Sequence, residues 1–294
     1  MPSNFKTVAI VAKPDGVGVA APLNTLIELL KRRGIAVHLD TRTAEFSAIQ
    51  PDAVMPRNPL DELIESADLA IAVGGDGTML AVARIVARHG VPLVGINLGH
   101  LGFLTDISAD FAADSLSDLL DGKFTEEKRT LLEAEILRDD QAVFRSVALN
   151  DVVVSRGAMG TMIEFAVEVN GEFVYSARAD GLIIATPTGS TAYALSSGGP
   201  ILQPGLPAIA LVPISPHTLS NRPIAISSDS EVRVKLLHGQ NARVNFDVQS
   251  YFDPATDDVV SVRAHPKPLR LLHPFGYSYF GMLRTKLHWN ERTT

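Results

Sequence analysis

The sequence predicts an α/β domain with a parallel sheet, followed by an antiparallel β-rich domain. Its first third alternates apolar, strand-like runs with amphipathic, helix-like runs, which is typical of a parallel sheet covered by helices. Near residue 125 the pattern changes, and short strand-like runs follow one another. The 294 residues suffice for two hydrophobic cores. We therefore expect an α/β domain at 1–124, a β-rich domain at 125–275 and a C-terminal segment at 276–294 that returns to the first domain.

In the first domain, strands and helices are expected to alternate. The helices end at Gly34 and Gly90, because glycine readily adopts the left-handed conformation that ends many helices. The apolar runs between them are interpreted as strands. The expected strands are 7–12, 35–40, 69–73 and 91–96, and the expected helices are 22–34 and 77–90.

In the second domain, one turn is predicted from two residues. Asn170-Gly171 separates two alternating runs, and this pair favours a type I′ hairpin turn because both residues accept a positive φ. Helical character returns only near 281–289. The expected strands are 131–138, 147–155, the two arms of the hairpin within 162–179, 181–186, 208–214, 231–237, 242–248 and 259–264.

The composition argues against several classes of function. A formal net charge of −7 disfavours a nucleic-acid partner. The chain has no cysteine, which excludes disulfides and thiolate metal sites and fits a reducing compartment. The first residues carry too short an apolar run for a signal peptide, and no run approaches the roughly 18 residues of a membrane span. We expect a soluble, cytoplasmic protein with no nucleic-acid and no membrane partner.

The stretch AVGGDGTML joins an expected strand to an expected helix. Gly74, Gly75 and Gly77 would allow a tight turn with positive φ and a close approach of a ligand to the backbone. The unpaired N–H groups at the start of the helix favour an anion such as phosphate. No Gly-Lys-Ser/Thr follows, so this is not a Walker A loop. Asp76 places a carboxylate in this turn, either as a simple helix N-cap or as a functional acid.

A second glycine-rich stretch, DGVGVAA at 15–21, follows the first expected strand. With Asp40 at the end of the next strand, it resembles a dinucleotide-binding turn of the dehydrogenase type. The letters KPD separate the strand from these glycines, however, and an ordinary helix entry explains them as well. His217 and His273 each lie beside a proline and are interpreted as structural loop residues.

Three further loops combine turn residues with polar or aromatic side chains. Residues 97–106 offer Phe103 as a flat face for a base, although a purely hydrophobic loop fits equally. Asn150 and Asp151 precede a strand, where such residues often serve only to form turns. Residues 176–200 supply hydroxyls, glycines and a tyrosine, which suit a ribose or a phosphate. A loop whose hydroxyls bond to its own backbone is the alternative.

The motifs resemble those of bacterial NAD kinases, in the same order and over nearly the whole chain: GGDGTML, NLGHLGFL, the Asn-Asp pair, DGLIIATPTGSTAYALSSGGPI and a late DVQ. GGDG alone is shared with phosphofructokinases and with lipid kinases such as diacylglycerol kinases, whereas the TPTGSTAY block is far more specific. Three alternatives stay open: another GGDG-type kinase that acts on a lipid or a sugar phosphate, a non-catalytic dinucleotide-binding regulator, and a dehydrogenase.

The resemblance implies that ATP, as co-substrate, gives its γ-phosphoryl group to the 2′-hydroxyl of the adenosine ribose of NAD, which yields NADP. It also implies a divalent cation, usually Mg²⁺, whose ligands stay unassigned, and a homodimer or homotetramer. Asp76 corresponds to the general base of the family. Asp151 stands where many members have glutamate, and Thr161 where some have histidine. The resemblance assigns NAD binding to Asp76, Gly77, Phe103, Asn150, Asp151, Thr161, Arg178, Asp180, Thr188, Thr191, Ala192, Tyr193, Ala194, Leu195, Ser196 and Gln249, and the phosphate loop to Gly74, Gly75 and Gly77.

Overall fold

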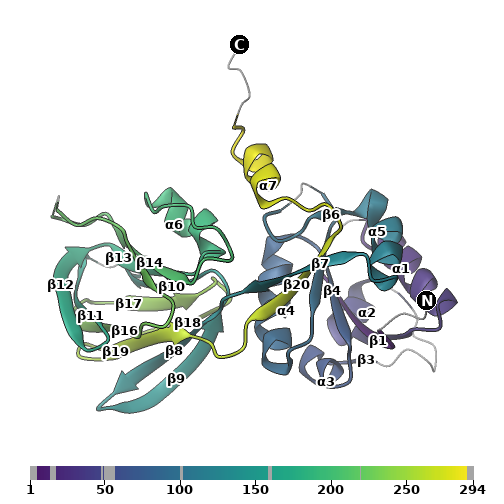
Figure 1. Ribbon diagram of the computed structural model, residues 1–294. Coiled ribbons are helices and arrows are strands. Elements are labelled where there is room, and N and C mark those ends of the chain that lie inside the picture. Colours follow the sequence, from purple (N-terminus) through teal and green to yellow (C-terminus); the bar gives the residue numbers. More distant parts are fainter. Residues whose placement is uncertain are drawn as a thin grey trace. The chain divides into compact units, whose positions relative to one another are not determined.

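The computed structural model describes residues 5–13, 18–47, 49, 57–99, 102–157, 161–218 and 220–289. The chain divides into two compact units, which Figure 1 shows as ribbons. The first unit consists of Met1–Lys128 and Leu269–Thr294, and the second of Arg129–Pro268. The second unit is therefore one continuous segment, and the first combines segments from both sides of it.

The first unit is built on an eight-stranded sheet with helices on both faces (Figure 1). The pairs β1–β2, β1–β4 and β4–β5 are all parallel, and β4 and β5 are buried along their whole length, as expected for a sheet covered on both sides. The strand order is β3 (Arg57–Asn58), β2 (Ala36–Asp40), β1 (Thr7–Ala12), β4 (Leu69–Val73), β5 (Leu93–Asn97), β20 (Leu269–Pro274) and β7 (Phe124–Arg129), and β6 (Ile107–Ser108) pairs with β5.

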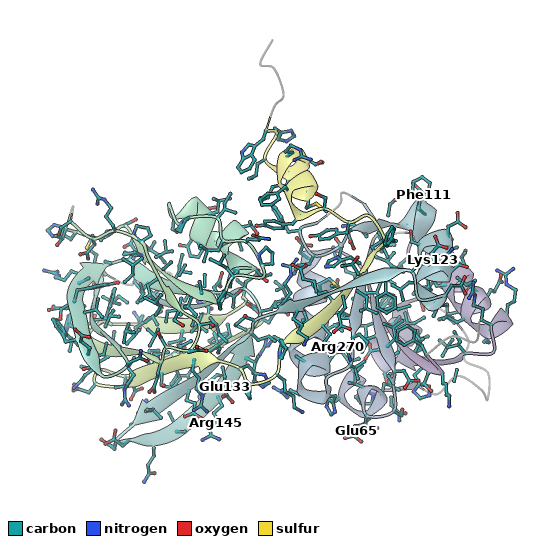
Figure 2. All side chains as sticks on the ribbon, in the orientation of Figure 1. Glu65, Phe111, Lys123, Glu133, Arg145 and Arg270 are labelled. Carbon is teal, nitrogen blue, oxygen red and sulfur yellow. The ribbon has the colours of Figure 1, made fainter. Side chains whose placement is uncertain are left out.

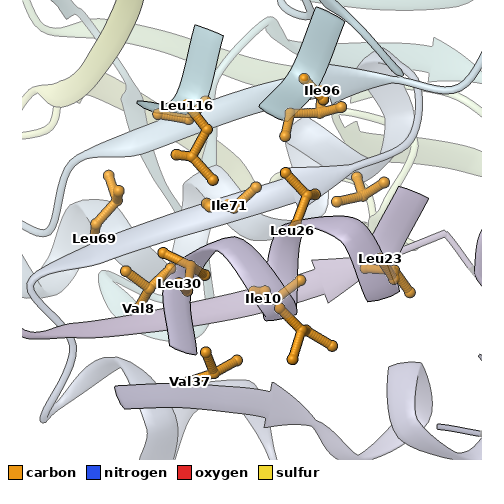
Figure 3. Packing of buried hydrophobic residues seen from close by; sticks show 14 of the residues in the cluster. Val8, Ile10, Leu23, Leu26, Leu30, Val37, Leu69, Ile71, Ile96 and Leu116 are labelled. Atoms are coloured by element: carbon orange, nitrogen blue, oxygen red, sulfur yellow. The ribbon is translucent and has the colours of Figure 1, made fainter. Parts of the chain in front are cut away.

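The helices that cover this sheet bury one apolar face each against it. In α1, Leu23, Leu26 and Leu30 recur every three to four residues and pack with strand residues such as Ile10 and Ile71 (Figure 3). Among the described residues, no helix is long and apolar enough to cross a membrane. The helices are α1 (Ala20–Arg32), α2 (Thr41–Ser47), α3 (Leu60–Ile64), α4 (Asp76–His89), α5 (Ala112–Leu120, after a 3-10 turn at Ala109–Phe111) and α7 (Tyr279–Lys286).

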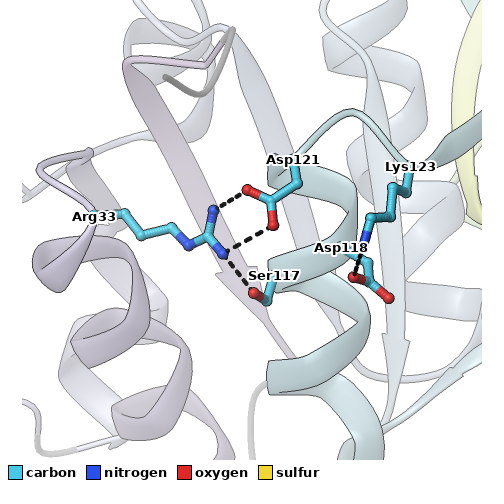
Figure 4. Close-up of polar contacts among 5 residues, drawn as sticks. All are labelled: Arg33, Ser117, Asp118, Asp121 and Lys123. Carbon is cyan, nitrogen blue, oxygen red and sulfur yellow. Dashed lines mark hydrogen bonds and ion pairs between the residues drawn. The ribbon is translucent and has the colours of Figure 1, made fainter. Parts of the chain in front are cut away.

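Polar contacts join the ends of α1 and α5 at the surface (Figure 4). The guanidinium of Arg33 donates to Asp121 Oδ1 at 2.6 Å and to Ser117 Oγ at 2.5 Å. Lys123 and Asp118 form a second, exposed pair at 2.9 Å. Because exposed ion pairs contribute less than about 1 kcal/mol, the apolar face of α1 supplies most of the stability here.

The strand order identifies the edge of the first sheet where a ligand is expected. The chain leaves β1 through α1 toward β2 on one side, and leaves β4 through α4 toward β5 on the other. In open α/β sheets, ligands bind outside the carboxyl ends of the strands at such a switch point. The GGDG stretch directly follows β4, so it lies at this switch point.

The second unit is a sandwich of two six-stranded antiparallel sheets (Figure 1). Alternate residues of both sheets, such as Val152 and Val154 on one and Phe165 and Val167 on the other, form a single core. One sheet has the order β15 (Ile224–Ser227), β14 (Ala208–Ile214), β13 (Gly181–Ala185), β10 (Asp151–Arg156), β17 (Ala242–Phe246) and β18 (Ser250–Phe252). The other has the order β12 (Glu172–Ala179), β11 (Ile163–Val169), β16 (Val232–His238), β19 (Val259–Ala264), β8 (Leu132–Arg138) and β9 (Gln141–Ala148).

The TPTGSTAY stretch covers the outer face of the first of these sheets. A 3-10 turn at Gly189–Thr191 and the short helix α6 (Tyr193–Ser196) follow β13. Ala194 and Leu202 pack on Val153 and Val212, whose strand neighbours face the main core on the other side. The stretch is therefore anchored on a sheet that is buried on both faces at this point.

The predicted fold class is confirmed, and so is the hairpin turn. Asn170 and Gly171 have φ values of 53° and 79°, as a type I′ turn requires. The prediction of one strand at 147–155 is wrong. β9 ends at Ala148 and β10 begins only at Asp151, because the backbone between them turns to donate hydrogen bonds to a side chain described below.

The chain returns to the first sheet before residue 276, where the sequence pattern placed the return. β20 pairs in parallel with β5, with Leu271 opposite Leu93. His273 therefore lies in a strand and not in the loop predicted for it. The proline beside it is tolerated because it is the last residue of β20.

Val248 is held in a backbone conformation that suits glycine, which gives a test of the fold. It lies in the turn between β17 and β18 with φ of 57°, and its side chain is 88% exposed. A β-branched residue is disfavoured in the left-handed region. Because the Val248 side chain is exposed, removing it takes away little buried apolar surface. We expect Val248→Gly to raise the free energy of unfolding by about 1 kcal/mol, which a thermal melt detects as a higher Tm.

The matched control is Val143→Gly, at an exposed position of β9 where φ is negative. This change should lower the Tm, because glycine weakens a strand. A lower Tm for both variants would contradict the strain assigned to Val248.

Candidate active site

The carboxylate of Asp76 contacts a turn that lies far along the chain. Asp76 is the first residue of α4, and Gly75 occupies the N-cap. Asp76 Oδ2 accepts a hydrogen bond from the backbone N–H of Phe103 at 2.9 Å, and Oδ1 accepts one from that of Leu104 at 3.0 Å. The interpretation of Asp76 as a helix N-cap is therefore wrong. Its side chain is held instead by the turn at 102–105.

Buried polar side chains fix this turn to the end of β5. Thr105 Oγ1 accepts hydrogen bonds from Asn97 Nδ2 at 2.7 Å and from the Gly102 N–H at 3.1 Å, and its hydroxyl donates to Asp76 Oδ1 at 3.5 Å. Asn97 Oδ1 accepts from the Gly99 N–H at 2.7 Å. Thr105 and Asn97 are buried. Since a buried polar group is costly unless it is bonded, the network holds the turn, and the turn holds the carboxylate.

The three glycines of the GGDG stretch differ in the space beside their Cα atoms. None of Gly74, Gly75 and Gly77 has a positive φ, so the expectation of left-handed glycines is wrong. A Cβ on Gly74 would overlap the side chain of Thr78, whereas a Cβ on Gly75 or Gly77 would meet nothing within 4 Å. Gly74 is thus needed for packing, and the other two leave open space beside the backbone.

A lysine that sequence reasoning missed lies beside the loop. Lys13 follows β1, and its backbone N–H donates to the carbonyl of Val73 at 2.9 Å. The Cβ of Lys13 would lie 3.1 Å from a Cβ built on Gly74, and its side chain is exposed. The signal was present in the sequence, as a lysine directly after the first strand. Only the pairing of β1 with β4 brings it to the glycines.

The dinucleotide-like pattern at 15–21 lies partly outside the described residues, which omit 14–17. The acid expected with it, Asp40, is buried and accepts hydrogen bonds from the N–H of Thr43 at 3.2 Å and from its hydroxyl at 3.4 Å. Asp40 thus caps the start of α2. This local role supports the interpretation of the stretch as an ordinary helix entry.

In the second unit, Asp247 organises the Asn150–Asp151 turn. Its buried carboxylate accepts hydrogen bonds from three successive backbone N–H groups, those of Leu149 at 2.6 Å, Asn150 at 2.8 Å and Asp151 at 3.1 Å. The DVQ letters predict Gln249 as a site residue and give no separate indication of a role for Asp247. The signal was an acid two residues before the selected glutamine, but its role depends on strands that pair across the sheet.

The TPTGSTAY loop packs directly on the same turn. The Thr186 hydroxyl donates to the Leu149 carbonyl at 2.5 Å, and a Cβ on Gly189 would overlap the carbonyl of Asn150. The Thr191 hydroxyl donates to the carbonyl of Thr188 at 3.1 Å, and Thr188 Oγ1 accepts from a guanidinium N–H of Arg129 at 3.2 Å. These hydroxyls bond within the protein, as the alternative interpretation of this loop expected.

The remaining predicted residues of this loop differ in exposure. Tyr193 and Ser196 are exposed, Ala192 and Leu195 are half-buried, and Ala194 is fully buried in the packing under α6. Gln249 is exposed in the turn that carries Asp247. Polar groups of Tyr193, Ser196 and Gln249 are therefore the ones open to a ligand.

Three predicted residues lie at the opposite end of β13 from this loop. Asp180 precedes β13, and its Oδ1 accepts a hydrogen bond from Arg156 Nε at 2.6 Å. Arg178 is the last residue but one of β12, the strand before β13 in the chain, and Thr161 precedes β11; both are exposed. Asp180 and Thr186 flank the five residues of β13, and the six residue steps between them span about 20 Å. Within one chain, the second unit thus carries its predicted residues in two groups.

Asp151 is the most unusual ionisable group of this turn. Burial, and then the charge of Asp247, raise the pKa of its carboxyl from 3.8 to about 7. Its side chain is 5% exposed. At neutral pH the carboxyl is thus partly protonated, so it can donate a hydrogen bond as well as accept one.

Comparison with known proteins identifies the family. Residues 8–124 match the family model of the ATP-NAD kinase N-terminal domain, and residues 149–273 match that of the ATP-NAD kinase C-terminal domain. The chain belongs to the NAD kinase family. The NAD kinase of Nitrosomonas europaea is 50% identical over 286 residues, 97% of this chain and 96% of that protein. That of Aromatoleum aromaticum is 49% identical over 290 residues, 99% of this chain and 96% of that protein.

Two solved structures of NAD(H) kinases share the fold. Yeast NADH kinase in complex with NADH superposes with a TM-score of 0.89 at 26% identity, covering 99% of this chain and 90% of that one. An NAD kinase from Archaeoglobus fulgidus in complex with ATP superposes with a TM-score of 0.75 at 29% identity, covering 96% of this chain and 98% of that one. The motif-based assignment to NAD kinases is therefore confirmed, and the chain is an enzyme of the kinase class.

Gly102 offers a direct test of how Asp76 is held. A Cβ at Gly102 would overlap Asp76 Oδ1 and approach Thr105 Oγ1 to 2.6 Å. We expect Gly102→Ala to displace the carboxylate, so that the N–H groups of Phe103 and Leu104 lose their acceptor and exchange with solvent about tenfold faster or more. Amide hydrogen exchange followed by NMR measures this. Gly99→Ala is the control, because its Cβ would meet nothing closer than 4.0 Å; equal exchange in both variants would contradict the contact.

Asp151 makes a second prediction, on pH and stability. Because its folded pKa of about 7 lies above the usual 3.8, its contribution to stability is complete below about pH 4 and is lost as the pH rises through 7. We expect Asp151→Asn to be more stable than the wild type at pH 8, by up to roughly 4 kcal/mol, and equally stable near pH 4. Denaturant unfolding at several pH values measures this.

Asp247→Asn is the matched control for this pair of acids. Its carboxylate accepts three backbone N–H groups, so the change should lower stability at pH 8. If the two variants shifted stability in the same direction at pH 8, the account of this turn would be wrong.

Proposed function

We propose that this chain transfers the γ-phosphoryl group of ATP to the 2′-hydroxyl of the adenosine ribose of NAD, with Asp76 as the general base. The observation that carries the proposal is a fixed carboxylate at the topological switch point of the first sheet. The two related structures, one in complex with NADH and one in complex with ATP, support the choice of substrates.

The hydrogen bonds of Asp76 leave it able to accept a proton. A carboxylate has about four acceptor positions. Two on Oδ1 face Leu104 and Thr105, and one on Oδ2 faces Phe103, so the second position of Oδ2 is left for a substrate hydroxyl. The hydroxyl proton passes to Oδ2 as the ribose oxygen bonds to phosphorus and the bond from phosphorus to ADP breaks.

The backbone beside Asp76 suits the phosphate groups. Gly75 and Gly77 leave space for a close approach, and the first N–H groups of α4 favour an anion. Lys13 adds a cation next to Gly74, the role that a lysine fills in other phosphate loops. Together these groups offset the repulsion between the phosphates and Asp76.

A divalent cation, most simply Mg²⁺, fits this site as a companion of ATP. Among the described residues, no group of three His, Cys, Asp or Glu side chains could hold a metal by itself. Mg²⁺ needs no such cage, because it commonly keeps several waters and binds substrate phosphates with one or two carboxylates. When bound, it neutralises charge on the transferring phosphoryl group. We assign it no protein ligand.

We propose that the loops of the second unit bind the nucleotide. Asn150 and Asp151 present a half-buried amide and a partly protonated carboxyl, and Tyr193 and Gln249 add exposed polar groups. The distance from this loop to Thr161, Arg178 and Asp180 favours a role for those three in the site of a second copy of the chain. A homodimer or homotetramer would allow this arrangement.

The alternatives have less support. A different GGDG-type kinase would not need the TPTGSTAY loop that packs on Asn150. A non-catalytic regulator would not need the fixed carboxylate of Asp76. The absence of cysteine supports a reducing compartment, and we propose the cytoplasm.

The direct test is incubation with NAD, ATP and Mg²⁺, with NADP followed by a dehydrogenase specific for NADP. We expect NADP to form only when ATP is present, with no oxidation or reduction of the nicotinamide. No NADP, or hydride transfer in its place, would overturn the proposal.

Asp76→Asn tests the role of the base. We expect kcat to fall about 10²- to 10⁴-fold with little change in KM for NAD, because the amide cannot accept the proton. In this variant an NH2 group replaces one of the two carboxylate oxygens that accept the N–H groups of Phe103 and Leu104. Since an NH2 group cannot accept these bonds, a thermal melt should accompany the assay to detect any loss of stability. Asp114→Asn, an exposed acid in the first turn of α5, is the control and should keep wild-type kcat. A turnover within threefold of wild type for Asp76→Asn would exclude it as the base.

A further inference from the structure

A buried histidine with a carboxylate at each ring nitrogen lies in the first unit. His273 Nδ1 is 2.8 Å from Asp106 Oδ2, and Nε2 is 3.0 Å from Glu127 Oε2. The ring stacks on Tyr277 with centroids 3.9 Å apart and planes 8° from parallel. His273 is 2% exposed. The proposed chemistry does not use this cluster.

The geometry requires a charged imidazole when both acids are ionised. A neutral imidazole has one N–H donor, and an ionised carboxylate only accepts, so two such contacts need the doubly protonated ring. Burial lowers the pKa of His273, but the hydrogen bonds and charges of Asp106 and Glu127 outweigh it and raise the pKa above 6.5. Among the described residues, no other charged group shifts this pKa; β5, which lies beside β20, has no titratable side chain.

The cluster is joined to Asp76 by the chain itself. Asp106 directly follows Thr105, whose hydroxyl donates to Asp76. The turn that holds Asp76 is thus fixed at Thr105 by the amide of Asn97 and at the next residue by the contact between Asp106 and His273. β20 carries His273, so this contact ties the turn to an interior strand of the sheet, between β5 and β7.

We propose that His273 is a positioning residue, which holds Asp76 in place through Asp106 and the turn at 102–106. The inference rests on the proposed function of Asp76. The protonated ring fixes Asp106, Asp106 fixes the end of the turn, and the turn directs its two N–H groups at the carboxylate. When the ring loses a proton, one of its two hydrogen bonds is lost and the turn loosens.

The test compares His273→Gln with a matched variant on the same strands. Arg270, labelled in Figure 2, also joins β20 to β7, with its guanidinium 2.7 Å from Glu126 Oε2, but it does not contact Asp106. We expect His273→Gln to lower kcat about 10- to 100-fold with KM for NAD within about threefold of wild type. Arg270→Gln should keep the wild-type kcat, even if its Tm falls.

Two further measurements distinguish positioning from stability. The N–H groups of Phe103 and Leu104 should exchange with solvent faster in His273→Gln and not in Arg270→Gln. The kcat of the wild type should fall as the pH rises through the folded pKa of His273, which lies above 6.5, and His273→Gln should lack this fall. If His273→Gln does not fold, Asp106→Asn, which keeps the shape of the side chain, should give the same loss of kcat.

The outcomes separate the two proposals. Equal kcat values for His273→Gln and Arg270→Gln, or unchanged exchange at Phe103 and Leu104, would overturn the positioning role. A wild-type enzyme that forms no NADP would overturn the proposed function, while the exchange of these two N–H groups would still decide whether His273 holds the turn.

Discussion

The pairing of one carboxylate with two backbone N–H groups is the interaction on which the first unit's site depends. Asp76 could cap its own helix, but it bonds to Phe103 and Leu104 instead. The acceptor is thereby fixed at the carboxyl edge of the sheet, next to the open backbone of Gly75 and Gly77. A catalytic group held this way needs little rearrangement during reaction, which is the main advantage of a preorganised site.

In the second unit, the carboxylate of Asp247 likewise accepts hydrogen bonds from backbone N–H groups. Asp247 accepts three successive N–H groups and so breaks what would be a continuous strand into β9 and β10. The turn made in this way presents Asn150 and supports the loop that contains Gly189. Asp151 follows it into a buried position and keeps its proton to about pH 7. In both units, a carboxylate that bonds to backbone shapes a loop where the motifs predict a ligand.

Much of the fold could be predicted from the sequence, because apolar period and turn chemistry act locally. Strands such as 7–12 and 208–214 agree with β1 and β14 at both ends. The site residues were harder to predict from the sequence than the strands and helices. The motif letters point to Asp76 and Asn150 as site residues, but they give no role to Lys13 or to Asp247, the first letter of DVQ, and they predict only a loop residue at His273. The roles of those three depend on which strands pair, and pairing across the chain is not visible in a local pattern.

A crystal structure of the wild-type enzyme with NAD bound tests the role of Asp76 most directly. We expect the 2′-oxygen of the adenosine ribose to lie about 2.6–3.2 Å from Asp76 Oδ2, with the hydrogen bond from the Leu104 N–H to Oδ1 intact. An Asp76 carboxylate that has rotated off the turn, or a 2′-oxygen beyond hydrogen-bond distance of it, would contradict the account.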